Sequence, residues 1–313
     1  MVKTRHVVTA AASAACLIAA LMLGTAPASA TYPGLNGRLA FGMALGANVE
    51  IFSVLPNGHD LSQLTDRPGF NACANYSSNG RSISWCGAGG PGVSEIWAMK
   101  ANGKHQHQVT HTGGFLTFPN YSPDGDRIAF SGKLPGDTKE AIFVIETDGS
   151  DMVRLTDNSS NNSLPAWSPD GSHVAFISDR TGVPQVWVMN SDGSNPEQLT
   201  KDPFPKTQLP DWSPSGKKIA FASVDTSGGP DIFVMNADGT GAMQLTKHAA
   251  VNFAPRWSPD GTKIAFVTSR DMPPAARTVY IMNADGGDQH PVHPGGRQLA
   301  PSWQPLPLDD ESD

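Results

Sequence analysis

A repeating pattern of residues runs along most of this 313-residue chain. Its clearest copy begins with Trp-Ser-Pro-Asp-Gly at 167–171, continues with Val-Ala-Phe at 174–176, and ends with Leu-Thr at 199–200. The opening aromatic residue recurs 45 or 46 positions apart, at Tyr76, Tyr121, Trp167, Trp212, Trp257 and Trp303. A period of this length, with about four short apolar runs inside it, is typical of the blades of a β-propeller.

Each copy carries the signals of four short antiparallel strands joined by tight turns. In the copy quoted above, we expect strands at 165–167, 173–178, 185–190 and 196–200. Proline suits the second position of the Ser-Pro-Asp-Gly turn, and glycine accepts the positive φ that follows. The two middle strands are continuously apolar, which indicates burial on both faces, as expected between neighbouring blades.

The two ends of the repeat array complement each other. The first copy begins at Gly37–Phe41 without a Trp-Ser-Pro-type strand, whereas the last copy ends with an extra strand of that type, Ala300–Trp303. We expect this C-terminal strand to complete the first blade, because closure removes the open sheet edges. The predicted fold is therefore all-β: a closed, six-bladed propeller of four-stranded antiparallel blades over residues 31–304.

The first thirty residues have the features of a cleaved signal peptide. Lys3, Arg5 and His6 precede an apolar stretch at 7–23, and Ala28-Ser29-Ala30 is a typical cleavage site. An uncleaved membrane anchor is the alternative. We expect an exported, monomeric protein, secreted or held in the periplasm or cell envelope, with no membrane span after cleavage. Residues 305–313 form an acidic, proline-rich tail.

The charge pattern argues against nucleic acid as a partner. The formal net charge of the chain is −7, and loss of Lys3 and Arg5 with the signal peptide changes it to −9. Acidic and basic residues are interspersed, so no basic stripe is available to a phosphate backbone.

Two cysteines remain after cleavage, Cys73 and Cys86. They flank the turn at 77–80, so an antiparallel hairpin would bring them almost opposite each other. In an oxidising compartment, this arrangement predicts a disulfide. A redox or metal-binding pair would need closer spacing or additional ligands.

The repeats resemble those of TolB-type β-propellers. The resemblance rests on the phrases Trp-Ser-Pro-Asp-Gly-Thr-Lys-Ile-Ala-Phe at 257–266 and Ile-Met-Asn-Ala-Asp-Gly at 281–286, and it spans residues 35–304. It implies a propeller that binds a partner at the mouth of its channel. TolB carries an α/β domain ahead of its propeller, whereas here the first repeat begins soon after the cleavage site. Roles that belong to that domain are therefore not expected of this chain.

Motifs for enzymatic or metal chemistry are weak. A peptidase would need a nucleophile elbow, and Gly-x-Ser-x-Gly does not occur. Each Asp-Gly turn supplies one acidic residue, too few for a calcium loop. The histidines gather in two groups, His105, His107 and His111, and His290 and His293, which we interpret as solvated side chains. We therefore predict no metal and no cofactor.

The repeats differ most at polar positions on or just before the innermost strands. The candidate binding residues at these positions are Asn75, Asn120, Asn162, Gln208, Asp211, Asn252 and Arg256. They predict a non-catalytic scaffold that binds a protein, peptide or glycan at its channel face; alternatively, they only hydrate the channel.

An exported polysaccharide lyase or hydrolase is the alternative function. That activity would need a pocket shared by at least three of four residues, Asp211, Arg256, His248 and His111.

Overall fold

A computed structural model describes residues 33–224, 229–247, 250–270, 277–293 and 296–307. These residues form β-strands, turns and loops, and none of them lies in a helix. The described part of the chain accordingly contains no helix of the length and apolarity that a membrane crossing requires. The predicted signal peptide (1–30), His248 and most of the acidic tail lie outside the described residues.

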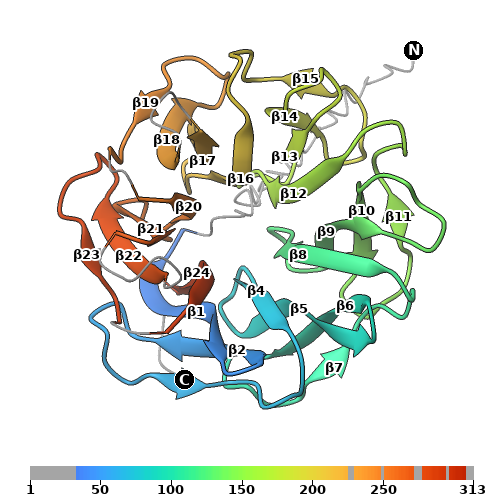
Figure 1. The fold of residues 1–313 in the computed structure, drawn as a ribbon, viewed down its shortest axis with the longest axis vertical. Coiled ribbons are helices and arrows are strands. Elements are labelled where there is room, and N and C mark those ends of the chain that lie inside the picture. Colours follow the sequence, from blue (N-terminus) through green and yellow to red (C-terminus); the bar gives the residue numbers. More distant parts are fainter. Residues whose placement is uncertain (1–32, 225–228, 248–249, 271–276, 294–295, 308–313) are drawn as a thin grey trace, which may run out of the picture.

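The strands form five sheets arranged around a central axis (Figure 1). The first sheet contains β24 (Gln298–Leu306), β1 (Leu35–Leu45), β2 (Asn48–Val54) and β3 (Ser62–Gln63). Three further four-stranded sheets are β12 (Asn162–Trp167), β13 (His173–Ser178), β14 (Gln185–Asn190) and β15 (Glu197–Gln198); β16 (Lys206–Trp212), β17 (Lys218–Val224), β18 (Pro230–Asn236) and β19 (Met243–Gln244); and β20 (Asn252–Trp257), β21 (Lys263–Thr268), β22 (Thr278–Asn283) and β23 (His290–Pro291).

The remaining sheet has eight strands. They are β4 (Asn71–Tyr76), β5 (Ser82–Gly90), β6 (Val93–Lys100), β7 (His107–Gln108), β8 (Phe115–Tyr121), β9 (Arg127–Lys133), β10 (Ala141–Glu146) and β11 (Val153–Arg154). Within this sheet, β4–β7 and β8–β11 are two antiparallel sets of four, joined by one parallel pair between Ser94 and Phe115. The all-β propeller is thus confirmed, although the structure has five sheets rather than six separate ones.

The C-terminal strand closes the ring. β24 pairs antiparallel with β1, with Leu39 opposite Trp303 and Leu35 opposite Leu306. The first sheet therefore combines the two ends of the described chain, as the unmatched strand in the last repeat predicts. This pairing covers the inner edge of β1, which would otherwise be open.

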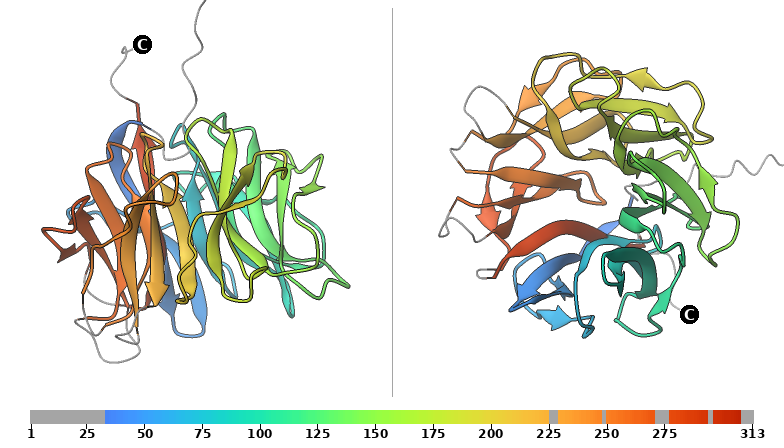
Figure 2. Two further views of the ribbon diagram at one scale, coloured as in Figure 1. Left: turned by 90° about the horizontal axis from the view of Figure 1, so that it is seen from above. Right: turned by 45° about the vertical axis from the view of Figure 1, so that its right-hand side comes forward.

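The ring has two different faces. The innermost strands are β4, β8, β12, β16, β20 and β24, and the strands run roughly along the ring axis (Figures 1 and 2). We call the end of the axis where these strands begin the loop face. The opposite end carries the Ser-Pro-Asp-Gly turns and is called the turn face.

Hydrogen bonds in the turns agree with the turn chemistry expected from the sequence. Ser168 Oγ donates to Asp170 Oδ1 at 2.5 Å, and the same carboxylate oxygen accepts the backbone N–H of Ser172 at 3.0 Å. Gly171 follows with φ of 70°, which glycine adopts without steric cost. The aspartates of these turns therefore stabilise the turn backbone by accepting hydrogen bonds.

A bulge in the first inner strand changes the hairpin register on which the predicted disulfide was based. The register of β4 and β5 shifts between Ala72 and Asn75, and Cys86 lies opposite Ala72 rather than Cys73. Cys73 itself has φ of 58° inside the bulge, so its side chain leaves the strand at a different angle. Both thiols are buried and free. Cys86 Sγ donates to the Ala72 carbonyl at 3.2 Å, and burial raises the pKa of the Cys86 thiol. The disulfide prediction is wrong, because an even hairpin register was assumed.

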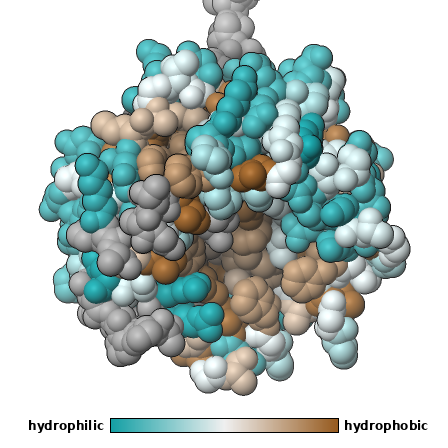
Figure 3. All heavy atoms as spheres, turned by 45° about the horizontal axis from the view of Figure 1, so that its top comes forward, coloured by the Kyte–Doolittle hydropathy of each residue, from teal (hydrophilic) through white to brown (hydrophobic). Residues whose placement is uncertain are grey.

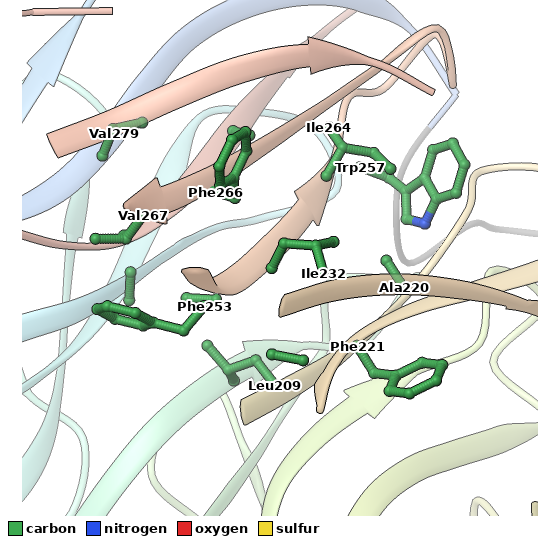
Figure 4. Close-up of a cluster of buried hydrophobic side chains, with 14 of the residues drawn as sticks. Leu209, Ala220, Phe221, Ile232, Phe253, Trp257, Ile264, Phe266, Val267 and Val279 are labelled. Atoms are coloured by element: carbon green, nitrogen blue, oxygen red, sulfur yellow. The ribbon is translucent and has the colours of Figure 1, made fainter. Parts of the chain in front are cut away.

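The core lies between neighbouring sheets. Phe221 and Ile232 from one sheet and Phe253, Ile264 and Phe266 from the next share one buried cluster (Figure 4). Phe266 and Ile264 have no exposed surface, in agreement with continuous apolar strands buried on both faces.

The threonine that ends each repeat joins the outermost strand to the next strand inward. Thr246 Oγ1 accepts the backbone N–H of Ile232 at 3.0 Å and donates to Asp231 Oδ1 at 2.5 Å. Thr156 Oγ1 accepts the equivalent N–H of Ile142 at 2.9 Å. The repeated Leu/Val-Thr signature thus satisfies backbone groups that the two-residue outer strands leave unpaired.

Replacing Thr246 by valine should destabilise the fold more than the same change at Thr156. Thr246→Val removes a partner from both the Ile232 N–H and the buried Asp231 carboxylate, which should cost about 2–3 kcal/mol. Thr156→Val affects one backbone N–H and should cost about 1 kcal/mol. Urea unfolding of both variants measures the difference. Equal losses would show that the carboxylate contact adds nothing.

Candidate functional site

Polar residues before the repeat aromatics connect the inner strands of neighbouring repeats near the ring axis. Asn75 Oδ1 accepts the backbone N–H of Tyr121 at 3.0 Å, and Asn120 Oδ1 accepts that of Trp167 at 3.1 Å. Ser302 Oγ does the same for Tyr76 at 3.0 Å. Each acceptor thus lies one repeat before its donor, except at the ring closure, where Ser302 of the last strand serves Tyr76 near the chain start. These contacts give the variable position a structural role that the sequence analysis did not assign.

A buried ion pair occupies the equivalent place between the last two full repeats. Asp211 Oδ2 accepts the Trp257 backbone N–H at 2.7 Å, and Asp211 Oδ1 accepts from Arg256 Nη1 at 3.0 Å. Asp211 is 6% exposed and Arg256 is 7% exposed. Burial raises the pKa of Asp211, although Arg256 and the Trp257 N–H act in the opposite direction. Because the pair is buried, removal of either charge should greatly lower the free energy of unfolding.

These residues surround a small polar cavity near the turn face. Its volume is about 30 Å³, and its lining includes Asn75, Asn120, Asp211, Arg256 and Ser302. That volume corresponds to about one water molecule. The structure thus brings four of the predicted site residues together, in a space too small for a peptide or sugar.

Two other predicted residues, Asn162 and Asn252, lie at the opposite ends of their strands and are fully buried. Asn162 Oδ1 accepts from Arg180 Nη2 at 2.9 Å, and the guanidinium group stacks 4.6 Å from the Trp187 ring. Asn252 Nδ2 donates to Asp231 Oδ1 at 2.9 Å. Both asparagines therefore fix the starts of inner strands beneath the loop face.

The seventh predicted residue, Gln208, lies in β16 opposite Ala222. Its side chain is outside the described part of the structure. Contact between any of the seven residues and a partner stays a prediction.

Two aromatic side chains are exposed at the loop face, where inner strands begin, and we call their surroundings the mouth. Phe70 and Phe115 are 49% and 53% exposed, and each forms a parallel bridge to the preceding repeat, with Val49 and Ser94 respectively. They therefore occupy equivalent positions in successive repeats. In an oblique space-filling view of this side of the ring, brown residues line the central hollow, and teal residues lie mainly above it and to its sides (Figure 3).

A pocket of about 290 Å³ adjoins Phe115 at this mouth. Its lining residues are Phe115, Thr117, Phe118, Ser131, Glu140, Ser163 and Leu164. Burial raises the pKa of Glu140. Phe70 and Phe115 are not among the predicted site residues. Their signal in the sequence is an aromatic residue at the end of a linker, where polar residues are usual.

The residues required by the lyase or hydrolase alternative do not share the axial cavity. Asp211 and Arg256 line it, whereas His111 is exposed and is absent from its lining. His248 is outside the described residues. Within the described ranges, no group of three or more His, Cys, Asp or Glu side chains is placed to hold a metal ion.

Comparison with known proteins identifies the repeats. The model of the TolB beta propeller domain matches residues 92–203 and 201–307, more than half of the chain. The chain belongs to this family. None of the curated proteins matches the sequence.

Solved structures share the fold at low sequence identity. TolB from Acinetobacter baumannii is 18% identical, with a TM-score of 0.68 over 86% of this chain and 67% of that one. A chain of a nidogen/laminin complex is 12% identical, with a TM-score of 0.71 over 87% and 99%. An oligogalacturonate lyase in complex with manganese is 16% identical, with a TM-score of 0.57 over 85% and 77%. At these identities, the similarity establishes the propeller fold alone.

Proposed function

We propose that this TolB-family propeller is an exported, monomeric and non-catalytic scaffold that binds a protein partner at the loop-face mouth. In this proposal, residues 1–30 are a cleaved signal peptide and residues 31–304 form six blades, the eight-stranded sheet contributing two. The single parallel pair between Ser94 and Phe115 supports this division, because every other pair in that sheet lies within one repeat.

The exposed aromatic residues at the mouth carry the proposal. Phe70 and Phe115 are about half exposed, although burial of such side chains is favourable by about 1.5–3 kcal/mol each. An exposed aromatic side chain beside a pocket offers an anchor for a side chain of a protein partner. The interblade hydrogen bonds of Asn75, Asn120 and Asp211 favour this surface over the axial cavity, because those side chains already have partners.

The pocket offers an apolar wall to a side chain of a protein partner. Phe115, Phe118 and Leu164 supply this wall, while Thr117, Ser131, Glu140 and Ser163 supply polar groups. A loop that inserts one apolar side chain would bury the exposed face of Phe115 and enter the 290 Å³ space beside it.

Phe115→Ser should abolish recovery of the partner from the cell envelope or culture fluid by tagged mature protein. An aromatic residue at the centre of an interface contributes about 2 kcal/mol or more, which corresponds to about thirtyfold in affinity. The measurement is quantitative pull-down with the wild type and the variant at matched concentrations.

Met243→Ser is the matched control. Met243 is 52% exposed in β19 at the outer rim, so it changes a similar apolar area away from the mouth. This control should recover the partner as the wild type does. Equal recovery by Phe115→Ser and Met243→Ser would reject the proposed surface.

A further inference from the structure

A second, larger pocket opens on the opposite face of the ring, between the β12–β15 and β16–β19 sheets. Its volume is about 670 Å³, within the range of ordinary ligand pockets. Val188, Leu199 and Trp212 supply apolar surface, and the prolines of two successive turns, Pro169 and Pro214, complete the wall.

The charged groups in this pocket are mainly acidic. Asp170, Glu197 and Asp238 all line it, and His173 is the one basic residue among the described lining residues. A hydrogen bond from Thr240 lowers the pKa of Asp238, so its carboxylate stays ionised. Glu197 is exposed and has no hydrogen-bond or ion-pair partner among the described residues.

The repeat itself does not impose this charge. The equivalent pocket between β4–β7 and β8–β11 has about 360 Å³ and is lined by Lys100, His105 and His107. His107 begins β7 as Glu197 begins β15, so the two residues hold the same place in their repeats. The two pockets are formed by equivalent parts of two repeats, but the side chains that line them differ in the sign of their charge.

We infer that the 670 Å³ pocket binds a peptide segment carrying a lysine or arginine side chain flanked by apolar residues. Charge complementarity supports this occupant, because Asp170, Glu197 and Asp238 line a pocket that also has apolar walls. In this arrangement the cation lies beside Glu197, and the flanking apolar side chains contact Val188 and Leu199. This site is separate from the mouth at Phe115, which lies on the other face.

The test uses a fluorescently labelled, end-blocked peptide, Ala-Leu-Arg-Leu-Ala, and fluorescence polarisation with the mature protein. A second peptide carries glutamate in place of arginine and should bind at least tenfold more weakly. Glu197→Lys should weaken binding of the arginine peptide by about tenfold, because it reverses a charge beside the bound cation. Raising the salt concentration should weaken it further.

Two matched variants separate this site from other surfaces. His107→Glu places an acidic residue in the equivalent pocket and should leave the measured affinity unchanged, as should Phe115→Ser at the mouth. Ala237→Phe narrows the pocket and should weaken binding without reversing charge. Equal binding of both peptides, or an unchanged affinity in Glu197→Lys, would overturn the inference. A similar loss in Phe115→Ser would also overturn it, by assigning the peptide to the mouth.

Discussion

Removal of the C-terminal strand should leave the chain unable to fold. A chain that ends at Arg297 lacks β24, which supplies the innermost strand of the first sheet. The inner edge of β1 then becomes an open row of unpaired backbone groups. We therefore expect an aggregated or unfolded product instead of a shortened propeller.

The loss of stability should be large because β24 packs against and hydrogen-bonds to several other strands. Trp303 is 6% exposed, and its Nε1 donates to the Arg256 carbonyl at 3.2 Å. Gln298 Oε1 accepts the Val279 N–H at 2.8 Å, and Ser302 Oγ accepts that of Tyr76. Loss of a buried tryptophan side chain alone costs about 3–5 kcal/mol, and a domain has about 5–15 kcal/mol in total.

Circular dichroism and size-exclusion chromatography of the truncated protein measure this outcome. A chain that ends at Leu306 keeps β24 and should fold as the full chain does. Addition of a synthetic peptide of residues 298–306 should restore structure to the shorter chain if closure is what it lacks. A cooperative melt of the chain ending at Arg297, at the temperature of the full chain, would refute the closure argument.

Much of this fold could be predicted from the sequence because each repeat encodes it separately. The Trp-Ser-Pro-Asp-Gly phrase specifies a turn, the continuous apolar runs specify strands buried on both sides, and the unmatched strand at Trp303 specifies the closing pair. These features depend on local turn chemistry and on period, which a single sequence displays. The parallel pair between Ser94 and Phe115 depends on how two successive repeats pack against each other, so the local sequence does not predict it.

The same distinction explains the errors at the candidate site. The bulge at Cys73 changes the register of β4 and β5 by a residue, and a hairpin pattern does not reveal such a shift. Asn75 and Asn120 were expected to face a ligand because they vary between repeats. Their partners are backbone N–H groups of the next repeat, 46 and 47 residues away, which sequence spacing alone does not identify.

Asp211→Leu should be the most damaging single substitution at the ring axis. It removes the acceptor of the Trp257 N–H and leaves the Arg256 guanidinium group buried without its counter-charge. Breaking a buried ion pair from one side costs about 3–5 kcal/mol. Asn75→Ala, which removes a neutral acceptor from the same kind of interblade contact, should cost about 1–2 kcal/mol. Urea midpoints at constant m-value give both losses.

The double variant Asp211→Leu/Arg256→Met separates charge from packing. With both charges gone, the penalty of an isolated buried cation disappears, so the double variant should be more stable than Asp211→Leu, although the Trp257 N–H still lacks its acceptor. A double variant as unstable as Asp211→Leu would show that the ion pair is not the source of the loss.

Arg256→Met should behave differently from Asp211→Leu, because a carboxylate can be neutralised by protonation and a guanidinium group cannot. Burial already raises the pKa of Asp211, and removing Arg256 takes away an interaction that lowers it. The folded state of this variant therefore binds a proton more readily than the unfolded chain does. Measured against Asp211→Leu, its stability should be greatest below the ordinary aspartate pKa of 3.8, and this difference should shrink as pH rises through the raised pKa of the folded state. The comparison cancels the other carboxylates, such as Asp170, whose lowered pKa makes the fold less stable in acid. Asp211→Leu lacks this titrating group, so the difference between the two pH profiles identifies which charge each variant leaves buried.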